Sequence, residues 1–278
     1  MVHLLQLEWK KLRHYRLFMI LIAIYMIALP AMFLSGASMG FNEIAGGPKG
    51  LYIFPAVWKY LGYLGNWMTF FCFGFLGVSL VTMEFANKTL RQNIITGMSR
   101  KSFFLGKIYI MVVISAFAAL YYLVIGLIFG FVNTDYVMTS RVMEGFMILP
   151  RYFLMCFAYM IVAFTLGLLI RRSGIALFIF FTYSIMGEQI LRYFVHHKIS
   201  SLFNNGNGFN DAMNYYPINA IEDLVPLPMP KEANQMMQQA LDKGYNFFLT
   251  PVEATFITLF YLTLFIGLAY YVFRKRDL

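Results

Sequence analysis

The sequence predicts an all-α membrane protein with six transmembrane helices, cytoplasmic N- and C-termini, and a short cytoplasmic helix between the second and third spans. Its composition is 60% hydrophobic and 13% charged, whereas soluble domains carry about 25% charged residues. Six apolar runs each approach the ~20 residues that a helix needs to cross a bilayer. Helices are expected because lipid offers the backbone no hydrogen-bond partners, and no alternation typical of barrel strands occurs.

The six apolar runs form a single transmembrane domain over residues 1–278. They cover residues 17–34, 64–83, 103–132, 152–170, 175–195 and 252–273. The third run is longer than the hydrocarbon is thick, so one of its ends should project into water. A cleaved signal peptide at the first run, cut near residues 35–37, is disfavoured because its apolar core exceeds the usual length of about 7–15 residues.

The distribution of basic residues predicts the orientation. With a cytoplasmic N-terminus, most of the 22 Lys and Arg residues lie in four inside segments, residues 1–16, 84–107, 171–174 and 274–278. Cytoplasmic loops carry such an excess of Lys and Arg. The net charge of +9 is spread over these segments and forms no single patch, so we expect no nucleic-acid partner.

Two features indicate contact with membrane lipid. Residues 1–16 form an amphipathic pattern, with Leu5, Trp9 and Leu12 on one stripe, which predicts a helix in the headgroup layer. Aromatic residues before the second span are typical of a belt at the membrane surface. They are Tyr52, Phe54, Trp58, Tyr60 and Tyr63.

The largest hydrophilic segment covers residues 196–250 and is expected outside the membrane. Its Asn- and Gly-rich first half is typical of a loop. Its second half predicts a helix from Pro230 to Gly244, since Pro favours the first helical position and Gly the stop. Thr250 and Glu253 have the spacing of a capping box that opens the sixth span.

The segment between the second and third spans, residues 84–107, carries the functional signal. Asn87 is a good N-cap and Gly97 a good stop, which predicts a short helix over residues 88–96. Ser99 or Ser102 is expected to cap the third span. A short helix that has its own cap and stop, and that is held between two spans, is stiff. It could therefore transmit a push from a cytoplasmic partner to both spans.

The ordered residues of this segment resemble the coupling segment of type-2 permeases of ATP-binding-cassette (ABC) exporters. The likeness rests on Glu84, Lys88-Thr89-Leu90, Ser99-Arg100 and Gly106-Lys107, together with the opening residues 7–13 and the closing residues 273–278. The resemblance implies a cytoplasmic ABC ATPase subunit docked on residues 88–96, a second permease copy or homologue in a dimer, and the cytoplasmic membrane of a bacterium. The implied ATPase interface includes Glu84, Lys88, Arg91, Gln92 and Arg100.

Several catalytic motifs are missing from the sequence. It contains no G-x-x-x-x-G-K-[ST] phosphate loop, no dinucleotide fingerprint, no H-E-x-x-H and no G-x-S-x-G. Cys72 and Cys156 each lie inside an apolar run, so neither a disulfide framework nor a metal site is expected. We therefore predict that the chain is not an enzyme and has no cofactor of its own, with ATP and Mg²⁺ bound on the partner subunit.

Charged residues inside membrane spans are functional candidates by default. Glu84 is spaced to pair with Lys88 and could form a hinge, an interface or a lipid-boundary contact. Glu188 and Arg192 have the same spacing in the fifth span. They could neutralise each other structurally, or form an outer gate or substrate contact.

The aromatic residues Phe70, Phe71 and Phe73 crowd the second span. They could form a wall for an apolar substrate, or they could simply pack against lipid and neighbouring helices. The favoured interpretation of the chain is a permease subunit that exports a hydrophobic or amphipathic cargo, such as a peptide antibiotic, drug or lipid. The alternative is a non-transporting scaffold or anchor of an envelope assembly.

Overall fold

In the computed structural model, six helices are long and apolar enough to cross a membrane, as the sequence predicts. The structure describes residues 2–36, 49–191, 194, 214–226 and 248–275, and no β-strand occurs among them. The six membrane helices are α2 (Arg16–Gly36), α4 (Ala56–Ala86), α6 (Arg100–Asn133), α7 (Thr139–Ile170), α8 (Ser173–Thr182) with its continuation to Leu191, and α12 (Pro251–Lys275). The shorter elements are α1 (Val2–Arg13), η1 (Gly50–Tyr52), α5 (Thr89–Ile95), the π-helical turn η2 (Tyr183–Gly187) and α10 (Pro217–Glu222).

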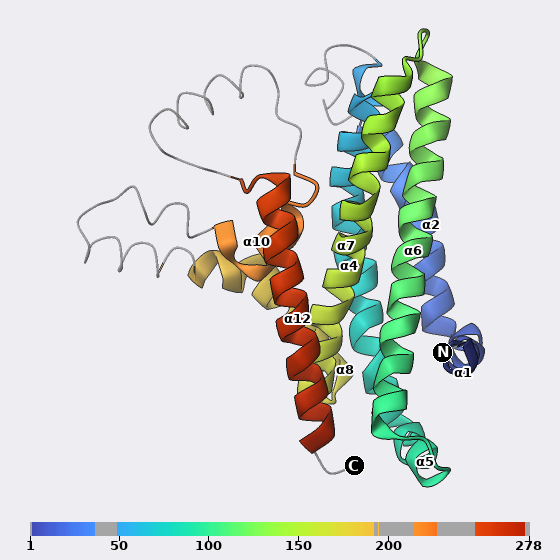
Figure 1. Cartoon of the computed structure of the whole chain (residues 1–278), viewed down its shortest axis with the longest axis vertical. Coiled ribbons are helices and arrows are strands. Elements are labelled where there is room, and N and C mark those ends of the chain that lie inside the picture. Colours follow the sequence, from blue (N-terminus) through green and yellow to red (C-terminus); the bar gives the residue numbers. More distant parts are fainter. Residues whose placement is uncertain (1, 37–48, 192–193, 195–213, 227–247, 276–278) are drawn as a thin grey trace.

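Helices α4 and α7 form the centre of the bundle (Figure 1). Their most apolar windows are each 72% buried, against 22% for α2, the fifth span and α12. Glycine allows the close approach of the two helices. A Cβ atom added at Gly77 would lie 2.5 Å from the backbone oxygen of Met160. Small residues at such contacts are the usual device for packing helices in membranes.

Helices α6 and α7 are longer than a bilayer requires. They have 34 and 32 residues, or about 50 Å at 1.5 Å per residue, against roughly 30 Å of hydrocarbon. Both extend beyond α12 at the upper end of Figure 1. The predicted projection of the third span is therefore consistent with the length of α6. Helix α7 begins well before the predicted residues 152–170.

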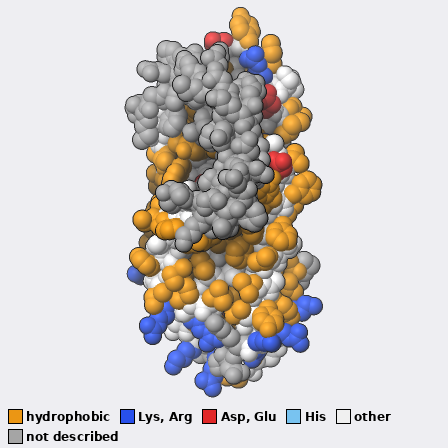
Figure 2. Space-filling model, turned by 90° about the vertical axis from the view of Figure 1, so that its left-hand side faces the viewer, with side chains coloured by type: hydrophobic (Ala, Val, Ile, Leu, Met, Phe, Trp, Pro, Cys, Tyr) orange, Lys and Arg blue, Asp and Glu red, His pale blue; other side chains and the backbone are white. Residues whose placement is uncertain are grey.

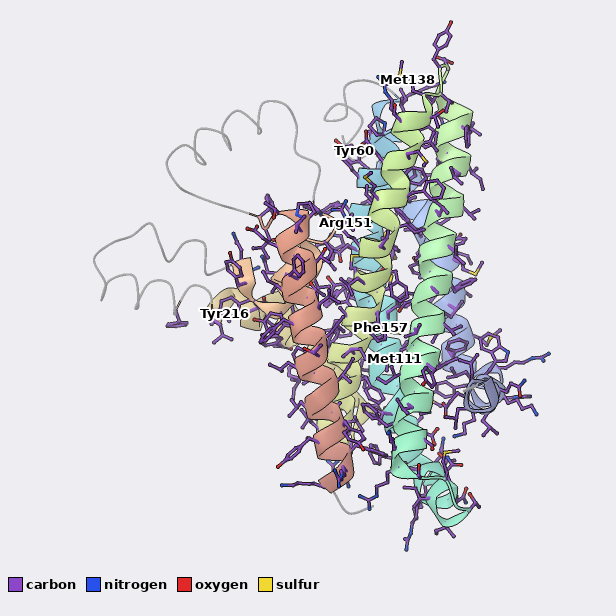
Figure 3. The ribbon with its side chains drawn as sticks, in the orientation of Figure 1. Tyr60, Met111, Met138, Arg151, Phe157 and Tyr216 are labelled. Carbon is purple, nitrogen blue, oxygen red and sulfur yellow. The ribbon has the colours of Figure 1, made fainter. Side chains whose placement is uncertain are left out.

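Three of the five aromatic residues before the second span lie inside the bundle and not in the predicted belt. Phe54, Trp58 and Tyr60 are all buried, and α4 already begins at Ala56. The Trp58 ring packs directly on the backbone at Gly126 and Gly145. A Cβ atom at either glycine would lie only 2.2 Å from the ring, so a larger residue would clash with it. Figure 3 labels Tyr60 in this part of α4. The prediction of a belt was therefore wrong for these three side chains, whereas Tyr52 and Tyr63 are partly buried.

Basic side chains gather at one end of the bundle, which we call the basic end. Figure 2 shows them below a broad apolar band. This end carries the starts of α2, α6 and α8 and the ends of α4, α7 and α12. The band and the basic end together are the pattern expected of a protein held across a bilayer.

The hydrophilic segment 196–250 is described in part. Arg192 and the helix predicted from Pro230 to Gly244 lie outside the described residues. Helix α10 inserts beside α7 and α12 (Figure 1), with Pro217, Ile218, Ala220 and Ile221 buried. The capping box is confirmed, because the Thr250 N–H donates to Glu253 Oε2 at 2.9 Å and the Glu253 N–H donates to Thr250 Oγ1 at 3.3 Å.

Candidate coupling site at the basic end

Helix α5 lies at the basic end, between α4 and α6 (Figure 1). The predicted helix over residues 88–96 corresponds to Thr89–Ile95 in the structure. Asn87 is not its N-cap as predicted, but ends α4 by donating its N–H to Met83 O at 2.9 Å. Lys88 then turns the chain with a φ of 55°, and Gly97 ends the segment with a φ of 98°.

Helix α5 has a buried side and an exposed side. Leu90 is buried, whereas Lys88, Arg91 and Gln92 are exposed. Ser99 caps α6 as predicted, since its hydroxyl oxygen accepts the Ser102 N–H at 3.1 Å. The exposed side of α5 is therefore mainly polar and cationic, with the apolar Ile95 side chain exposed at its end.

Arg100 has a different position from the other predicted interface residues. It is half-buried, and its guanidinium donates to Arg274 O at 2.8 Å. This bond joins the start of α6 to the end of α12. Arg100 therefore stabilises the packing of two spans beside α5.

A group of four charged side chains, three of them buried, lies behind α5. We call Glu8, Lys11, Glu84 and Lys107 the ion cluster. Lys107 Nζ donates to Glu8 Oε2 at 2.6 Å and to Glu84 Oε1 at 2.7 Å. Lys11 Nζ lies 3.0 Å from Glu84 Oε1 and 3.5 Å from Glu8 Oε1. Two carboxylates and two ammonium groups thus balance in charge.

The balance of charge in the ion cluster matters because most of its side chains are buried. The side chains of Glu8, Glu84 and Lys107 are 3–6% exposed, whereas Lys11 is 35% exposed. Removing charges from water costs several kcal/mol per ion unless close partners offset the cost. The Phe103 ring adds a further favourable contact, with Lys107 Nζ 5.2 Å and Lys11 Nζ 5.8 Å from its centroid.

The ion cluster joins elements that are distant in the sequence. Glu8 and Lys11 belong to α1, Glu84 to α4 and Lys107 to α6. The Thr89 hydroxyl of α5 also donates to Glu84 Oε2. Helix α1 lies across the bundle and is seen end-on in Figure 1. The Glu84 carboxylate is thus the common contact of α1, α4, α5 and α6.

The structure changes the predicted role of Glu84. No Glu84–Lys88 ion pair forms, although both residues are described, because Lys107, Lys11 and Thr89 occupy the carboxylate. Glu84 is also too buried to touch a docked protein directly. Sequence reasoning missed Lys107 and Lys11 as its partners. The sequence did carry a signal for Lys107, because it is a basic residue just inside the apolar run of the third span.

Glu188 acts on α10. Its two carboxylate oxygens accept the N–H groups of Ile218 and Asn219, both at 3.1 Å. A carboxylate in this position satisfies backbone donors that the helix itself leaves without partners. Its predicted partner Arg192 lies outside the described part of the chain.

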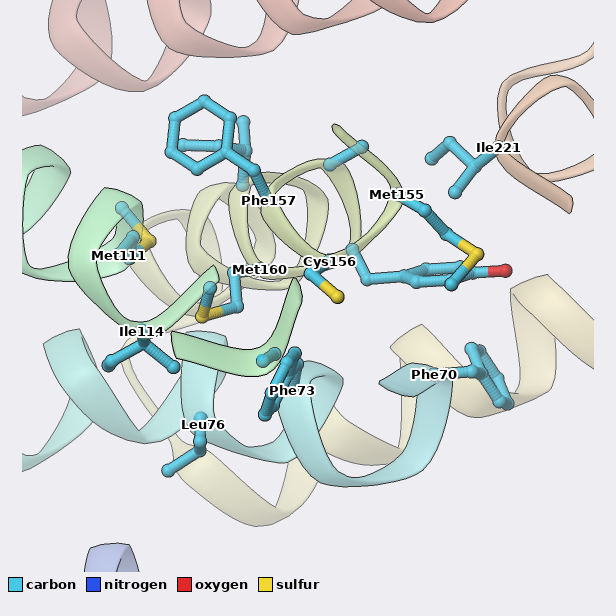
Figure 4. Close-up of a cluster of buried hydrophobic side chains, with 14 of the residues drawn as sticks. Phe70, Phe73, Leu76, Met111, Ile114, Met155, Cys156, Phe157, Met160 and Ile221 are labelled. Atoms are coloured by element: carbon cyan, nitrogen blue, oxygen red, sulfur yellow. The ribbon is translucent and has the colours of Figure 1, made fainter. Parts of the chain in front are cut away.

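The three phenylalanines do not form one wall. Phe70 stacks on Phe180 with ring centroids 5.3 Å apart, and Phe71 stacks on Phe181 at 5.4 Å. Phe73 is fully buried on another side of α4, where it packs against the Tyr25 ring at 4.9 Å. Figure 4 shows Phe70 and Phe73 at different places along α4. The prediction of a shared substrate surface was therefore wrong for Phe73.

A family model described as "ABC-2 family transporter protein" matches residues 4–187. The chain belongs to the ABC-2 transporter family. No curated protein matches it. The match extends from α1 into η2, so it includes the ion cluster and α5 but not α10 or α12. This ABC-2 permease is a multi-pass, non-catalytic membrane subunit of an ABC transporter, and its family implies partnership with an ABC ATPase.

Proposed function

We propose that this ABC-2 permease forms the export pathway for a hydrophobic or amphipathic cargo in the cytoplasmic membrane of a bacterium. The cargo class includes peptide antibiotics, drugs and lipids. The basic end faces the cytoplasm, in keeping with the excess of Lys and Arg there. ATP and Mg²⁺ bind on the partner ATPase, and a second permease copy or homologue completes the pathway.

The observation that carries this proposal is the link between the exposed side of α5 and the buried ion cluster. The ATPase docks on Lys88, Arg91 and Gln92, which face solvent. Helix α5 is held by the Lys88 turn on one side and by the Ser99 cap on the other. A displacement of α5 therefore acts on α4 and α6 together.

The ion cluster extends this displacement to α1. Thr89 binds the Glu84 carboxylate, which Lys107 connects to Glu8. Breaking these bonds would leave buried charges without partners, which costs about 3–5 kcal/mol. The four helices consequently move as one body when ATP binding and hydrolysis alternate the access of the cargo pathway.

The exposed apolar faces support a dimer. Helix α2, the fifth span and α12 are only 22% buried in their most apolar windows. These faces are available to lipid and to a second permease copy. A pathway between two copies would explain why the single chain keeps α4 and α7 tightly packed at its own centre.

Co-purification tests the proposal directly. The chain is purified in mild detergent from cells of its source organism, and the ABC ATPase recovered with it is measured. Arg91→Glu should reduce recovery about tenfold or more, because a like charge or a lost contact at an interface centre commonly costs 1–3 kcal/mol or more. Arg141→Glu is the matched control, an exposed arginine near the start of α7 at the far end of the bundle.

Two results would contradict the proposal. One is equal recovery of the ATPase with Arg91→Glu and Arg141→Glu. The other is an ATPase rate in lipid nanodiscs that no amphipathic cargo raises, as a scaffold would show. Export itself is measured as ATP-dependent uptake of a labelled cargo into inverted membrane vesicles, which also tests the direction of transport.

A further inference from the structure

A cavity of about 240 Å³ lies beside α10, away from the basic end. Asn66, Trp67 and Phe70 of α4 line it, together with Tyr159 of α7, Ser184 of η2 and Glu222 of α10. Asn66 is ten residues into α4, so the cavity lies about 15 Å along the helix from the end opposite to the basic end. Typical pockets for whole drug-sized ligands measure about 300–1,000 Å³, so this one suits a head group.

Ser184 presents an unused polar atom to the cavity. It is 8% exposed, and its buried hydroxyl has no hydrogen-bond partner in the described part of the chain. Buried polar atoms are normally hydrogen-bonded, so an exception requires an explanation. Ser184 lies in the π-helical turn η2, and turns of this kind occur frequently at functional sites.

Glu222 gives the cavity its charge. Among the described residues that line the cavity, it is the one that carries a formal charge. Its helix is fixed at the start by Glu188, and Ala220 O accepts a hydrogen bond from the Thr258 hydroxyl at 3.2 Å. Glu222 is exposed, and it lines the cavity from a well-anchored element.

Three of the remaining lining residues are aromatic, namely Trp67, Phe70 and Tyr159, and the others are Asn66, Ile185 and Gln189. Phe70 packs edge-on against Tyr159, with centroids 5.6 Å apart, and the Tyr159 hydroxyl donates to Asn66 Oδ1 at 2.8 Å. This bond holds the Tyr159 ring in place. Figure 4 shows Phe70 at the same edge of the core as Ile221, the neighbour of Glu222 in the chain. Aromatic rings around a carboxylate are the typical surroundings of an organic cation.

We propose that this cavity binds the ammonium group of a cationic amphipathic cargo. Glu222 neutralises the charge, the rings of Trp67, Phe70 and Tyr159 contact the alkyl groups on nitrogen, and Ser184 accepts a hydrogen bond where the ammonium carries a proton. Trp67 is 44% exposed, so the apolar tail of the cargo leaves the cavity past this side chain. This inference rests on the proposed export function and specifies its cargo class.

The test compares two probes of the same shape. Benzyltrimethylammonium carries a positive nitrogen where neopentylbenzene carries an uncharged carbon. Binding of tritiated benzyltrimethylammonium to the purified chain in phosphatidylcholine nanodiscs is measured by scintillation proximity. We expect saturable binding that neopentylbenzene does not displace. Glu222→Gln should weaken it about tenfold or more, which is the order of a charge pair near a protein surface.

Matched variants keep the test sharp. Glu144→Gln changes an exposed carboxylate on α7 that does not line the cavity, and it should bind like the wild type. Trp67→Leu should weaken binding several-fold while its size-exclusion profile stays unchanged. This second variant tests the cavity even if Glu222→Gln does not fold. The proposal is overturned if the wild type shows no saturable binding, if neopentylbenzene competes equally, or if Glu222→Gln binds normally. Because no ATPase is present, this outcome is independent of the Arg91→Glu result.

Discussion

Lys107→Met tests whether the ion cluster holds the basic end together. The substitution keeps an unbranched side chain of similar length but removes the ammonium group. In the wild type, Lys107 Nζ lies within 2.7 Å of both Glu8 and Glu84. Without it, these two buried carboxylates share Lys11 as their one remaining partner in the cluster, and Lys11 is partly exposed.

The expected cost follows from burial. Removing one member of a buried ion pair typically destabilises a protein by about 3–5 kcal/mol. A chain of this size loses roughly 2–4 °C of Tm per kcal/mol, so Lys107→Met should lower Tm by about 10 °C. Lys11→Met is the matched control. Since its side chain is 35% exposed, the loss of its ammonium group should cost about 0–1 kcal/mol.

The assay is thermal unfolding of the purified chain in detergent, followed by tryptophan fluorescence. A second variant checks the electrostatic cause. Glu8→Gln combined with Lys107→Met leaves Glu84 paired with Lys11 at 3.0 Å, so charge balance returns. We expect this double variant to recover more than half of the lost Tm. Partner recovery should persist in Lys107→Met, because the exposed side of α5 is unchanged.

Equal Tm values for Lys107→Met and Lys11→Met would refute this reasoning. A double variant less stable than Lys107→Met alone would refute it as well, since it would show that packing rather than charge sets the cost. Loss of ATPase stimulation with retained ATPase binding would place the ion cluster in the coupling path.

Two further predictions concern other parts of the bundle. Gly77→Ala should destabilise the chain by about 1–3 kcal/mol, because its Cβ would lie 2.5 Å from the backbone oxygen of Met160. Gly267→Ala meets nothing within 4 Å and should be neutral or stabilising by up to about 1 kcal/mol; equal Tm values would contradict the packing argument. Glu188→Ala should speed hydrogen exchange in α10 by removing the acceptor of its first amides, at a cost of about 0.5–2 kcal/mol. Exchange in α5 serves as its internal control, and unchanged exchange in α10 would be the contrary result.

Local features of the fold were predictable from the sequence. Hydropathy locates the six spans, because each is a continuous stretch that must satisfy its own backbone in lipid. The Gly97 stop, the Ser99 cap and the Thr250–Glu253 box also depend on residues close together in the chain. These features need no knowledge of tertiary packing, and the structure reproduces them.

Long-range contacts could not be predicted in this way. Lys107 meets Glu8 across 99 residues, and Lys11 meets Glu84 across 73. Spacing along one helix instead favoured Lys88 as the partner of Glu84. Trp58 was predicted at the membrane surface for the same reason, because the glycines on which its ring packs, Gly126 and Gly145, belong to two other helices. One-helix periodicity cannot indicate which distant element supplies a partner.

The position of the ion cluster accounts for the use of charges where apolar side chains would also pack. Apolar contacts hold helices in register less strictly, because the hydrophobic effect is non-directional. The Lys107 ammonium is satisfied in an arrangement that brings Glu8, Glu84 and Phe103 together at fixed distances. Sliding α1 or α4 would leave a buried charge without its partner. The helices at the basic end are thereby restricted to moving together, as the proposed coupling through α5 requires.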